Sequence, residues 1–264
     1  MDFLYKLSCS IFHPLRLHLS RWHPSREESF RVLGLIRELD IDTVIDVGAN
    51  TGQFAHSMLS QGFTGRIHSF EPQAVAHRQL QDHAQGHPSW TVAERCALGE
   101  SPGELDLHLS QNSYSSSFLP VNPVNLQAAP RTAYVGQERV RVLRLDDWAQ
   151  RIGICGRLLL KIDTQGFELK VLRGAQGLMP LIHGILVECS LVPLYDGQPL
   201  LQEIMDFLRD AHFQVIDILP GLRDPRSGRI LGLDLLARRQ APDPGQGRGQ
   251  PGPPSSTSAA PPCP

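Results

Sequence analysis

Apolar residues in the first half of the chain fall into two kinds of segment. Some form short continuous runs, which predict buried strands, and others recur every three or four residues, which predicts amphipathic helices. The two kinds alternate, and this order is typical of a parallel sheet whose strands are joined by right-handed helical crossovers. The predicted helices are 29–39, a helix from Phe54 onward and 74–85, and the predicted strands are 43–47, 66–72 and 90–98.

The alternation is interrupted once and then resumes. Residues 103–144 combine exposed strand patterns with polar loops, so we expect a β-rich or loop insertion over one end of the sheet. Within and just after it, residues 139–148 alternate between apolar and polar, which predicts a strand through Trp148. Because helices separate most of the strands, the predicted fold class is α/β, with helices on both faces of the sheet. The later predicted strands are 158–163, 184–190, 213–219 and 230–238, and the later predicted helices are 168–178 and 200–211.

The two ends of the chain differ from its centre, so we expect the folded domain over residues 41–239. Residues 240–264 are rich in proline, glycine and serine, which predicts a disordered tail. Residues 1–40 are expected to form a helical segment. Its apolar residues favour a helix packed on the domain, with contact to a membrane surface as the alternative. The apolar residues of this segment that lie at helical spacing beside basic residues are Phe3, Leu4, Leu7 and Ile11.

Composition changes this picture little. The chain has 264 residues and a formal net charge of −2, so bulk charge gives no support for a nucleic-acid partner. No apolar run approaches the ~20 residues that span a bilayer, and no signal peptide is evident. The five cysteines are widely spaced and form no metal or redox motif, which is typical of reduced, mostly buried thiols in a cytoplasmic protein.

The segment TVIDVGANTGQF at residues 43–54 leads from a predicted strand through a glycine turn into a helix. Gly48 and Gly52 allow the backbone to turn sharply and to approach a ligand closely. Their spacing does not match the dinucleotide fingerprint, and a phosphate-loop lysine is missing. Asp46 would repel a phosphate and would suit a cation, and S-adenosylmethionine carries an amino group and a sulfonium centre but no phosphate.

Glu71 ends the next predicted strand, about 20 residues after the turn, where an acid accepts hydrogen bonds from ribose hydroxyls in such folds. Taken singly, Asp46 could cap the turn and Glu71 could be a solvated strand end. Both acids at this spacing favour a site for S-adenosylmethionine.

The motifs together resemble those of FkbM-type methyltransferases. VIDVGANTGQF, IHSFEP, NSYSSSF, LLLKIDTQGFE, VLRGA and ILVECSLVPLYDGQ occur in the same order in that family, over roughly residues 41–239. The resemblance implies a class I methyltransferase fold, which is Rossmann-like and has a seven-stranded, mostly parallel sheet whose last strand is antiparallel. Cys189 departs mildly from the family pattern, because many members read ELS where this chain reads VECS.

The resemblance also implies an activity: S-adenosylmethionine-dependent methylation of a hydroxyl on a sugar, a glycoconjugate or a secondary metabolite. Ser116, in the serine-rich loop, would contact cofactor or acceptor. The residues expected to bind the cofactor are Asp46, Gly48, Asn50, Gly52, Phe54, Glu71 and Ser116.

Three acids are candidates for the chemistry, because a hydroxyl nucleophile benefits from a carboxylate that takes or orients its proton. Asp163 ends the strand LLLKID and is the first choice. Glu168 begins the following helix, where capping is an equal alternative. Glu188 lies in an apolar strand and needs a partner, either Lys161 or the serine loop, so a structural salt bridge is equally plausible for it. No metal signature is present, and no required metal is expected.

Two other functions remain open at this stage. One is N-methylation of a small metabolite, and the other is a non-catalytic member of the family that only binds the cofactor. The set of Asp46, Gly48, Gly52, Glu71 and Asp163 favours an active enzyme. The expected partner is a small-molecule or glycan acceptor.

Overall fold

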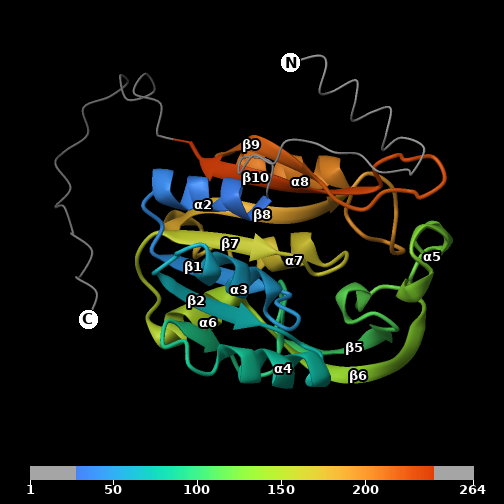
Figure 1. Ribbon diagram of the computed structural model, residues 1–264, viewed down its shortest axis with the longest axis horizontal. Coiled ribbons are helices and arrows are strands. Elements are labelled where there is room, and N and C mark those ends of the chain that lie inside the picture. Colours follow the sequence, from blue (N-terminus) through green and yellow to red (C-terminus); the bar gives the residue numbers. More distant parts are fainter. Residues whose placement is uncertain (1–27, 241–264) are drawn as a thin grey trace, which may run out of the picture.

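The computed structural model describes residues 28–240, and Figure 1 shows its ribbon. A seven-stranded sheet runs through the molecule in the order β3-β2-β1-β7-β8-β10-β9. All neighbouring strands are parallel except β10, which is antiparallel to both β8 and β9. The strands are β1 (Thr43–Val47), β2 (Arg66–Phe70), β3 (Trp90–Val92), β7 (Leu158–Ile162), β8 (Ile182–Ser190), β9 (Phe213–Pro220) and β10 (Gly232–Arg239).

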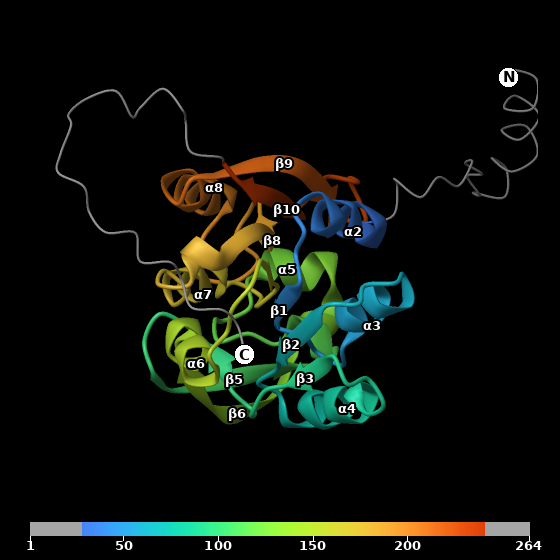
Figure 2. The ribbon, with the colours of Figure 1, turned by 90° about the vertical axis from the view of Figure 1, so that its left-hand side faces the viewer.

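Helices cover both faces of this sheet, as Figure 2 shows in a view that looks down the strands. On one face lie α2 (Glu28–Glu38), α3 (Gln53–Ser60) and α4 (Ala74–Ala84), and on the other lie α6 (Leu145–Ile152), α7 (Glu168–Arg173) and α8 (Leu201–Asp210). Each layer encloses an apolar core. Because both faces are covered, all five residues of β1 and all five of β7 are buried.

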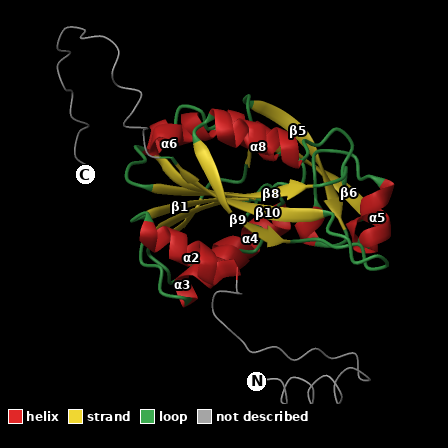
Figure 3. Cartoon of the chain, turned by 90° about the horizontal axis from the view of Figure 1, so that it is seen from above, coloured by secondary structure: helices red, strands yellow, loops and turns green. Residues whose placement is uncertain are grey.

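A second, three-stranded sheet projects beyond the carboxyl ends of the main strands. It has the order β4-β6-β5 and is built from β4 (Ala97–Leu98), β5 (Gly103–Ser110) and β6 (Tyr134–Leu143). Between β5 and β6 lie α5 (Pro123–Ala128) and the short 3-10 helices Ser113–Ser115 and Pro130–Thr132. Figure 3 shows this insertion at one end of the layered domain, where the main strands end.

The α/β class, the sheet and the insertion agree with the sequence-based expectations, whereas three element boundaries were wrong. The strand expected over 90–98 is two strands, because the chain leaves the main sheet after Val92 and β4 pairs with β6. The alternation expected through Trp148 ends at Leu143, and α6 begins at Leu145 with two acids in its first turn. The helix expected over 168–178 ends at Arg173, before Gly174. A Cβ at Gly174 would lie 2.1 Å from the carbonyl oxygen of Gly99.

Several expectations concern residues that lie outside the described part of the chain. The apolar residues near the N-terminus and the C-terminal tail belong to 1–27 and 241–264, so those predictions stay predictions. Within residues 28–240, no helix has both the length and the apolar character to cross a membrane. Cys96 and Cys189 are free and buried, as expected for reduced thiols.

Candidate active site

Two adjoining pockets open where the carboxyl ends of β1, β2 and β7 meet the insertion. The inner pocket spans about 600 Å³ and the outer pocket about 890 Å³, and both volumes include space that is open to solvent. The inner pocket combines apolar side chains (Phe70, Leu98, Leu107, Phe118, Phe167) with polar ones (Glu71, Ser113, Ser116, Gln165). The outer pocket is lined in part by Glu28, Gln53, Phe54 and Lys161. Both pockets share Gly48, Asn50, Tyr114 and Asp163, so they meet at the glycine turn.

Glu71 follows β2 and faces the inner pocket, with only 3% of its surface exposed. The backbone N–H of Gln73 donates to Oε1 and that of Asn50 donates to Oε2, each at 2.8 Å. Burial raises the pKa of this carboxyl to about 7, although the two backbone hydrogen bonds oppose the shift. Each oxygen retains a further lone pair, so the fixed carboxylate can accept from two neighbouring hydroxyls.

The turn between β1 and α3 needs its two glycines for different reasons. Gly48 has a φ of +75°, and a Cβ there would lie 1.8 Å from the carbonyl oxygen of Asp163. Gly52 has a φ of +94°, and a Cβ there would meet the Trp90 ring at 2.5 Å. Gly48 therefore shapes the pocket wall, whereas Gly52 allows α3 to pack on β3. Asn50, also at positive φ, carries the N–H that fixes Glu71.

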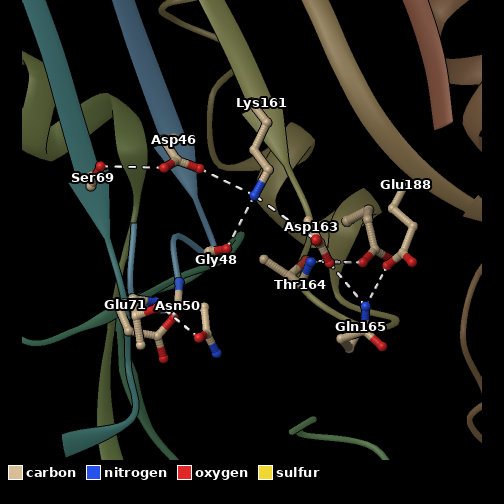
Figure 4. Close-up of polar contacts among 12 residues, drawn as sticks. Asp46, Gly48, Asn50, Ser69, Glu71, Lys161, Asp163, Thr164, Gln165 and Glu188 are labelled. Atoms are coloured by element: carbon tan, nitrogen blue, oxygen red, sulfur yellow. Dashed lines mark hydrogen bonds and ion pairs between the residues drawn. The ribbon is translucent and has the colours of Figure 1, made fainter. Parts of the chain in front are cut away.

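Asp46 is placed differently from the expectation that it faces a cationic ligand. It lies within β1, has no exposed surface and lines neither pocket. Its Oδ1 lies 3.1 Å from Nζ of Lys161, and its Oδ2 accepts from the Ser69 hydroxyl at 3.3 Å. Burial alone would lower the pKa of Lys161, but the charges of Asp46 and Asp163 raise it above its ordinary value. Asp46 is therefore one half of a buried ion pair, as Figure 4 shows.

Lys161 connects this ion pair to the pockets. Its ammonium donates to the carbonyl oxygen of Gly48 at 3.1 Å, and it lies 3.9 Å from Oδ2 of Asp163. It also lines the outer pocket, where it is 5.9 Å from the centre of the Phe54 ring. Lys161 thus bonds the glycine turn of β1 directly to β7. The sequence had suggested either Lys161 or the serine loop as the partner of Glu188. The structure pairs Lys161 with Asp46 instead, and Glu188 accepts from Gln165.

Asp163 follows β7 and borders both pockets, with 42% of its side chain exposed. Its backbone N–H donates to the carbonyl oxygen of Val47 at 3.0 Å, which fixes its position beside the turn. Oδ1 accepts from the side-chain amide of Gln165 at 2.9 Å. Among the three acids predicted for catalysis, Asp163 is the one that lines both pockets, and a bound molecule can reach it.

Glu188 lies in β8 and belongs to a group of acids at the ends of β7, β8 and β10. Gln165 donates to its Oε2 at 2.6 Å, and Asp234 faces it across the β8–β10 pair. Burial raises the pKa of Glu188 well above its ordinary value, and the neighbouring charges of Asp163, Glu168 and Asp234 add to the rise. Burial also raises the pKa of Asp234 to about 7.

Glu168 has a structural position. Its carboxylate is 4% exposed and lines neither pocket. Oε1 accepts from the backbone N–H and the hydroxyl of Thr164, at 3.0 and 3.2 Å, and both oxygens accept from the N–H of Gly166 at 3.0 Å. Burial raises its pKa, and these backbone hydrogen bonds oppose the rise. The capping alternative fits this geometry, and direct contact with a reacting group does not.

The serine loop forms the opposite wall of the pockets. Oγ of Ser116 accepts from the N–H of Ser110 at 3.1 Å, so its own proton remains available to a ligand in the inner pocket. The Ser113 hydroxyl donates to Oδ1 of Asn50 at 3.2 Å. Tyr114 is 61% exposed, and its hydroxyl accepts from Gln53 at 2.9 Å. These contacts join the loop to the glycine turn over the pockets.

Sequence reasoning missed three polar residues of the site: Gln165, Asp234 and Glu28. Gln165 lies inside the quoted motif LLLKIDTQGFE, and its place between two acids was a usable signal. Asp234 interrupts an apolar strand just as Glu188 does, so the same argument could have found it. Glu28 comes from α2, and nothing in the sequence places that helix beside the outer pocket. Among the described residues, no group of three or more His, Cys, Asp or Glu could hold a metal ion.

The sheet order with one antiparallel strand, and the paired pockets at its carboxyl edge, define a class I methyltransferase fold. The sequence matches the methyltransferase FkbM domain over residues 46–215, which is more than half of the chain. The protein belongs to this methyltransferase family.

Curated relatives are consistent with this assignment. The chain is 26% identical over 184 residues to the 2-O-methyltransferase NoeI of Sinorhizobium fredii, covering 67% of this chain and 75% of NoeI. It is 22% identical over 189 residues to the hexuronic acid methyltransferase AglP of Haloferax volcanii, covering 69% and 73% of the two chains. It is 27% identical over 199 residues to the 31-O-demethyl-FK506 methyltransferase FkbM of Streptomyces tacrolimicus, covering 66% and 74%.

Proposed function

We propose that this methyltransferase takes its methyl group from S-adenosylmethionine and transfers it to a hydroxyl of a sugar, a glycoconjugate or a secondary metabolite. One observation carries the choice of donor. Glu71 presents a carboxylate, fixed by two backbone N–H groups, to a pocket that is lined largely by apolar side chains. A vicinal diol matches that carboxylate, and a pyrophosphate does not.

The donor would occupy both pockets. Its adenosine fits the inner pocket, with apolar side chains around the base and Glu71 at the ribose. Its amino-acid part fits the outer pocket, where Glu28 and Asp163 suit the ammonium and Lys161 suits the carboxylate. The sulfonium methyl would then lie at the junction of the pockets, beside Gly48 and Asp163. Asp46 contributes through Lys161, without touching the donor.

Asp163 is the group we propose to act on the acceptor. Methyl transfer to oxygen is an in-line displacement, in which the protein aligns the acceptor and handles its proton. The exposed Asp163 carboxylate can accept that proton or orient the hydroxyl that carries it. Glu188 would contribute from the neighbouring strand end, and Glu168 would only hold the intervening turn.

The class of acceptor is proposed from the relatives. NoeI is described as a 2-O-methyltransferase, AglP as a methyltransferase of hexuronic acid, and FkbM as one that acts on 31-O-demethyl-FK506. The first two names indicate a carbohydrate oxygen, and the third indicates an oxygen of a secondary metabolite. The site is consistent with hydroxyl acceptors, because it presents carboxylate oxygens that accept hydrogen bonds.

The test combines donor binding with product formation. Calorimetry should give binding of S-adenosylmethionine and S-adenosylhomocysteine, and no binding of a nicotinamide dinucleotide. Methyl-labelled donor is then incubated with free sugars, uronic acids and glycolipid extracts, and labelled products are identified by mass spectrometry. Asp163→Asn should lose product formation, whereas donor binding should weaken only in part, because Glu28 remains beside the ammonium.

Other outcomes would select a rival function. Full activity of Asp163→Asn on an amine would favour N-methylation. Donor binding without turnover of any acceptor would favour a non-catalytic member of the family. Lack of donor binding would refute the proposal altogether.

A further inference from the structure

The side chain of Gln165 joins the two carboxylates nearest to the proposed acceptor. Its Nε2 donates to Oδ1 of Asp163 at 2.9 Å and to Oε2 of Glu188 at 2.6 Å, as Figure 4 shows. Neighbouring carboxyl groups disfavour a second negative charge between them. Here one amide NH2 group donates to both of them and fixes how they lie relative to each other.

The orientation of the amide is fixed from the other side. The hydroxyl of Tyr195 donates to Oε1 of Gln165 at 2.8 Å, so the amide oxygen faces Tyr195 and the nitrogen faces the acids. Tyr195 is itself 1% exposed, and its hydroxyl also contacts the carbonyl oxygen of Ser115 at 3.1 Å. The opposite orientation would set the amide carbonyl oxygen, which can only accept, against the two carboxyl groups.

The backbone under Gln165 is equally constrained. Gln165 has a φ of 54°, which is uncommon for a residue with a side chain. Its carbonyl oxygen accepts from the Ser117 hydroxyl at 2.6 Å. Glu168 binds the turn on both sides of it, at Thr164 and Gly166. A strained conformation that so many contacts maintain is typical of a functional position.

We propose that Gln165 is a positioning residue for methyl transfer: its amide, held between Tyr195 and Glu188, orients the carboxylate of Asp163 so that the other oxygen of Asp163 faces the acceptor. This inference rests on the proposed function. The amide uses Oδ1 of Asp163, which leaves Oδ2 for a hydroxyl of the acceptor. Glu188 lines neither pocket and holds the amide from the other side. This also gives Glu168 a role, because it holds the turn that carries the amide.

The inference can be tested on the protein without donor or acceptor. Glutamate and aspartate are labelled with 13C at the side-chain carboxyl, and their chemical shifts are followed against pH by NMR. A Glu188→Gln variant assigns the Glu188 signal. The groups that face Glu188 and shape its titration are Asp163, Glu168, Asp234 and Tyr195.

Gln165→Asn is the informative variant. Asparagine tolerates positive φ, so the turn can keep its conformation, but its amide is too short to reach both acids. Without the donors, the charged form of Glu188 loses its stabilisation, and its pKa should rise by about one unit or more. Tyr195→Phe leaves the Gln165 amide in place but frees it to rotate. The pKa of Glu188 should therefore rise less than in Gln165→Asn. Gln137→Asn, which shortens an exposed amide bonded to His108, is the matched control and should change nothing.

An unchanged Glu188 pKa in Gln165→Asn would overturn the inference, and so would an equal rise in the Gln137 control. Because the titration needs no ligand, its outcome is independent of donor binding. Failure of the protein to bind S-adenosylmethionine would refute the proposed function, and would leave the measured effect of the amide on the carboxylates intact.

Discussion

Replacing Glu71 by glutamine should remove the part of the pH dependence of cofactor binding that comes from Glu71. Glu71 is buried with a pKa of about 7, and we place its ionised form on the ribose hydroxyls of the donor. Below that pKa the carboxyl carries a proton and accepts hydrogen bonds more weakly. Affinity should therefore rise as pH increases through about 7 and level off above it. Glutamine keeps the shape of the side chain but does not titrate.

The structure sets the size of the effect. If binding requires the ionised form, the dissociation constant should fall about ten-fold between pH ~6 and pH ~8, since the ionised fraction changes by that factor around a pKa of about 7. Loss of the charge-assisted hydrogen bonds should weaken binding by about 1–3 kcal/mol at the higher pH. Glu71→Ala should lose as much, because it removes both acceptor oxygens.

Calorimetry with S-adenosylhomocysteine across this pH range measures both quantities. The ligand's own ionisation contributes equally to every variant, so the difference between the wild-type and Glu71→Gln profiles isolates Glu71. Glu138→Gln is the matched control. Glu138 accepts from the N–H of Ala74 at 2.9 Å and lines neither pocket, so its profile should follow the wild type. Parallel profiles for wild type and Glu71→Gln would refute the assignment of Glu71 to the ribose.

Two further predictions concern the framework of the site. Lys161→Met should lower the free energy of unfolding by about 3–5 kcal/mol in urea, because it leaves Asp46 charged and fully buried, whereas adding Asp46→Asn should recover most of that loss. A loss below about 1 kcal/mol would contradict the importance of the ion pair. Gly48→Ala should reduce both stability and S-adenosylhomocysteine affinity, because its Cβ would meet Asp163. Gly62→Ala, at a φ of +89° with open space around it, reports the backbone strain alone, and equal effects of both variants would exclude the steric argument.

The order of strands and helices could be predicted from periodicity, because each crossover leaves its own spacing in the sequence. Glu71 could be placed for a similar reason: it ends a strand beside the glycine turn, and parallel strands end at one edge of the sheet. The direction of Asp46 could not be predicted. Both faces of β1 are buried, so its residues show no alternation that would tell one face from the other.

The roles of Glu168 and Glu188 depend on a turn whose geometry has no periodic signal. Residues 164–166 fold back because Glu168 binds their backbone, and this brings Gln165 to Glu188, a residue 23 positions away. Sequence spacing placed these acids on neighbouring elements. It could not tell which of them faces solvent, which caps the turn and which receives the amide.

The charge argument that first suggested a cationic donor was based on Asp46, but the residues that can carry it are others, because Asp46 is buried and lines neither pocket. Lys161 is the cation at the junction of the pockets, and its charge is matched by Asp46 in the buried pair. Glu28 and Asp163 then give the outer pocket a negative balance. S-adenosylmethionine brings an ammonium and a sulfonium against one carboxylate, so its net positive charge complements that balance. The outer pocket can therefore attract a cation although Asp46 stays in the core. There Asp46 pairs with Lys161, whose ammonium donates to the carbonyl oxygen of Gly48.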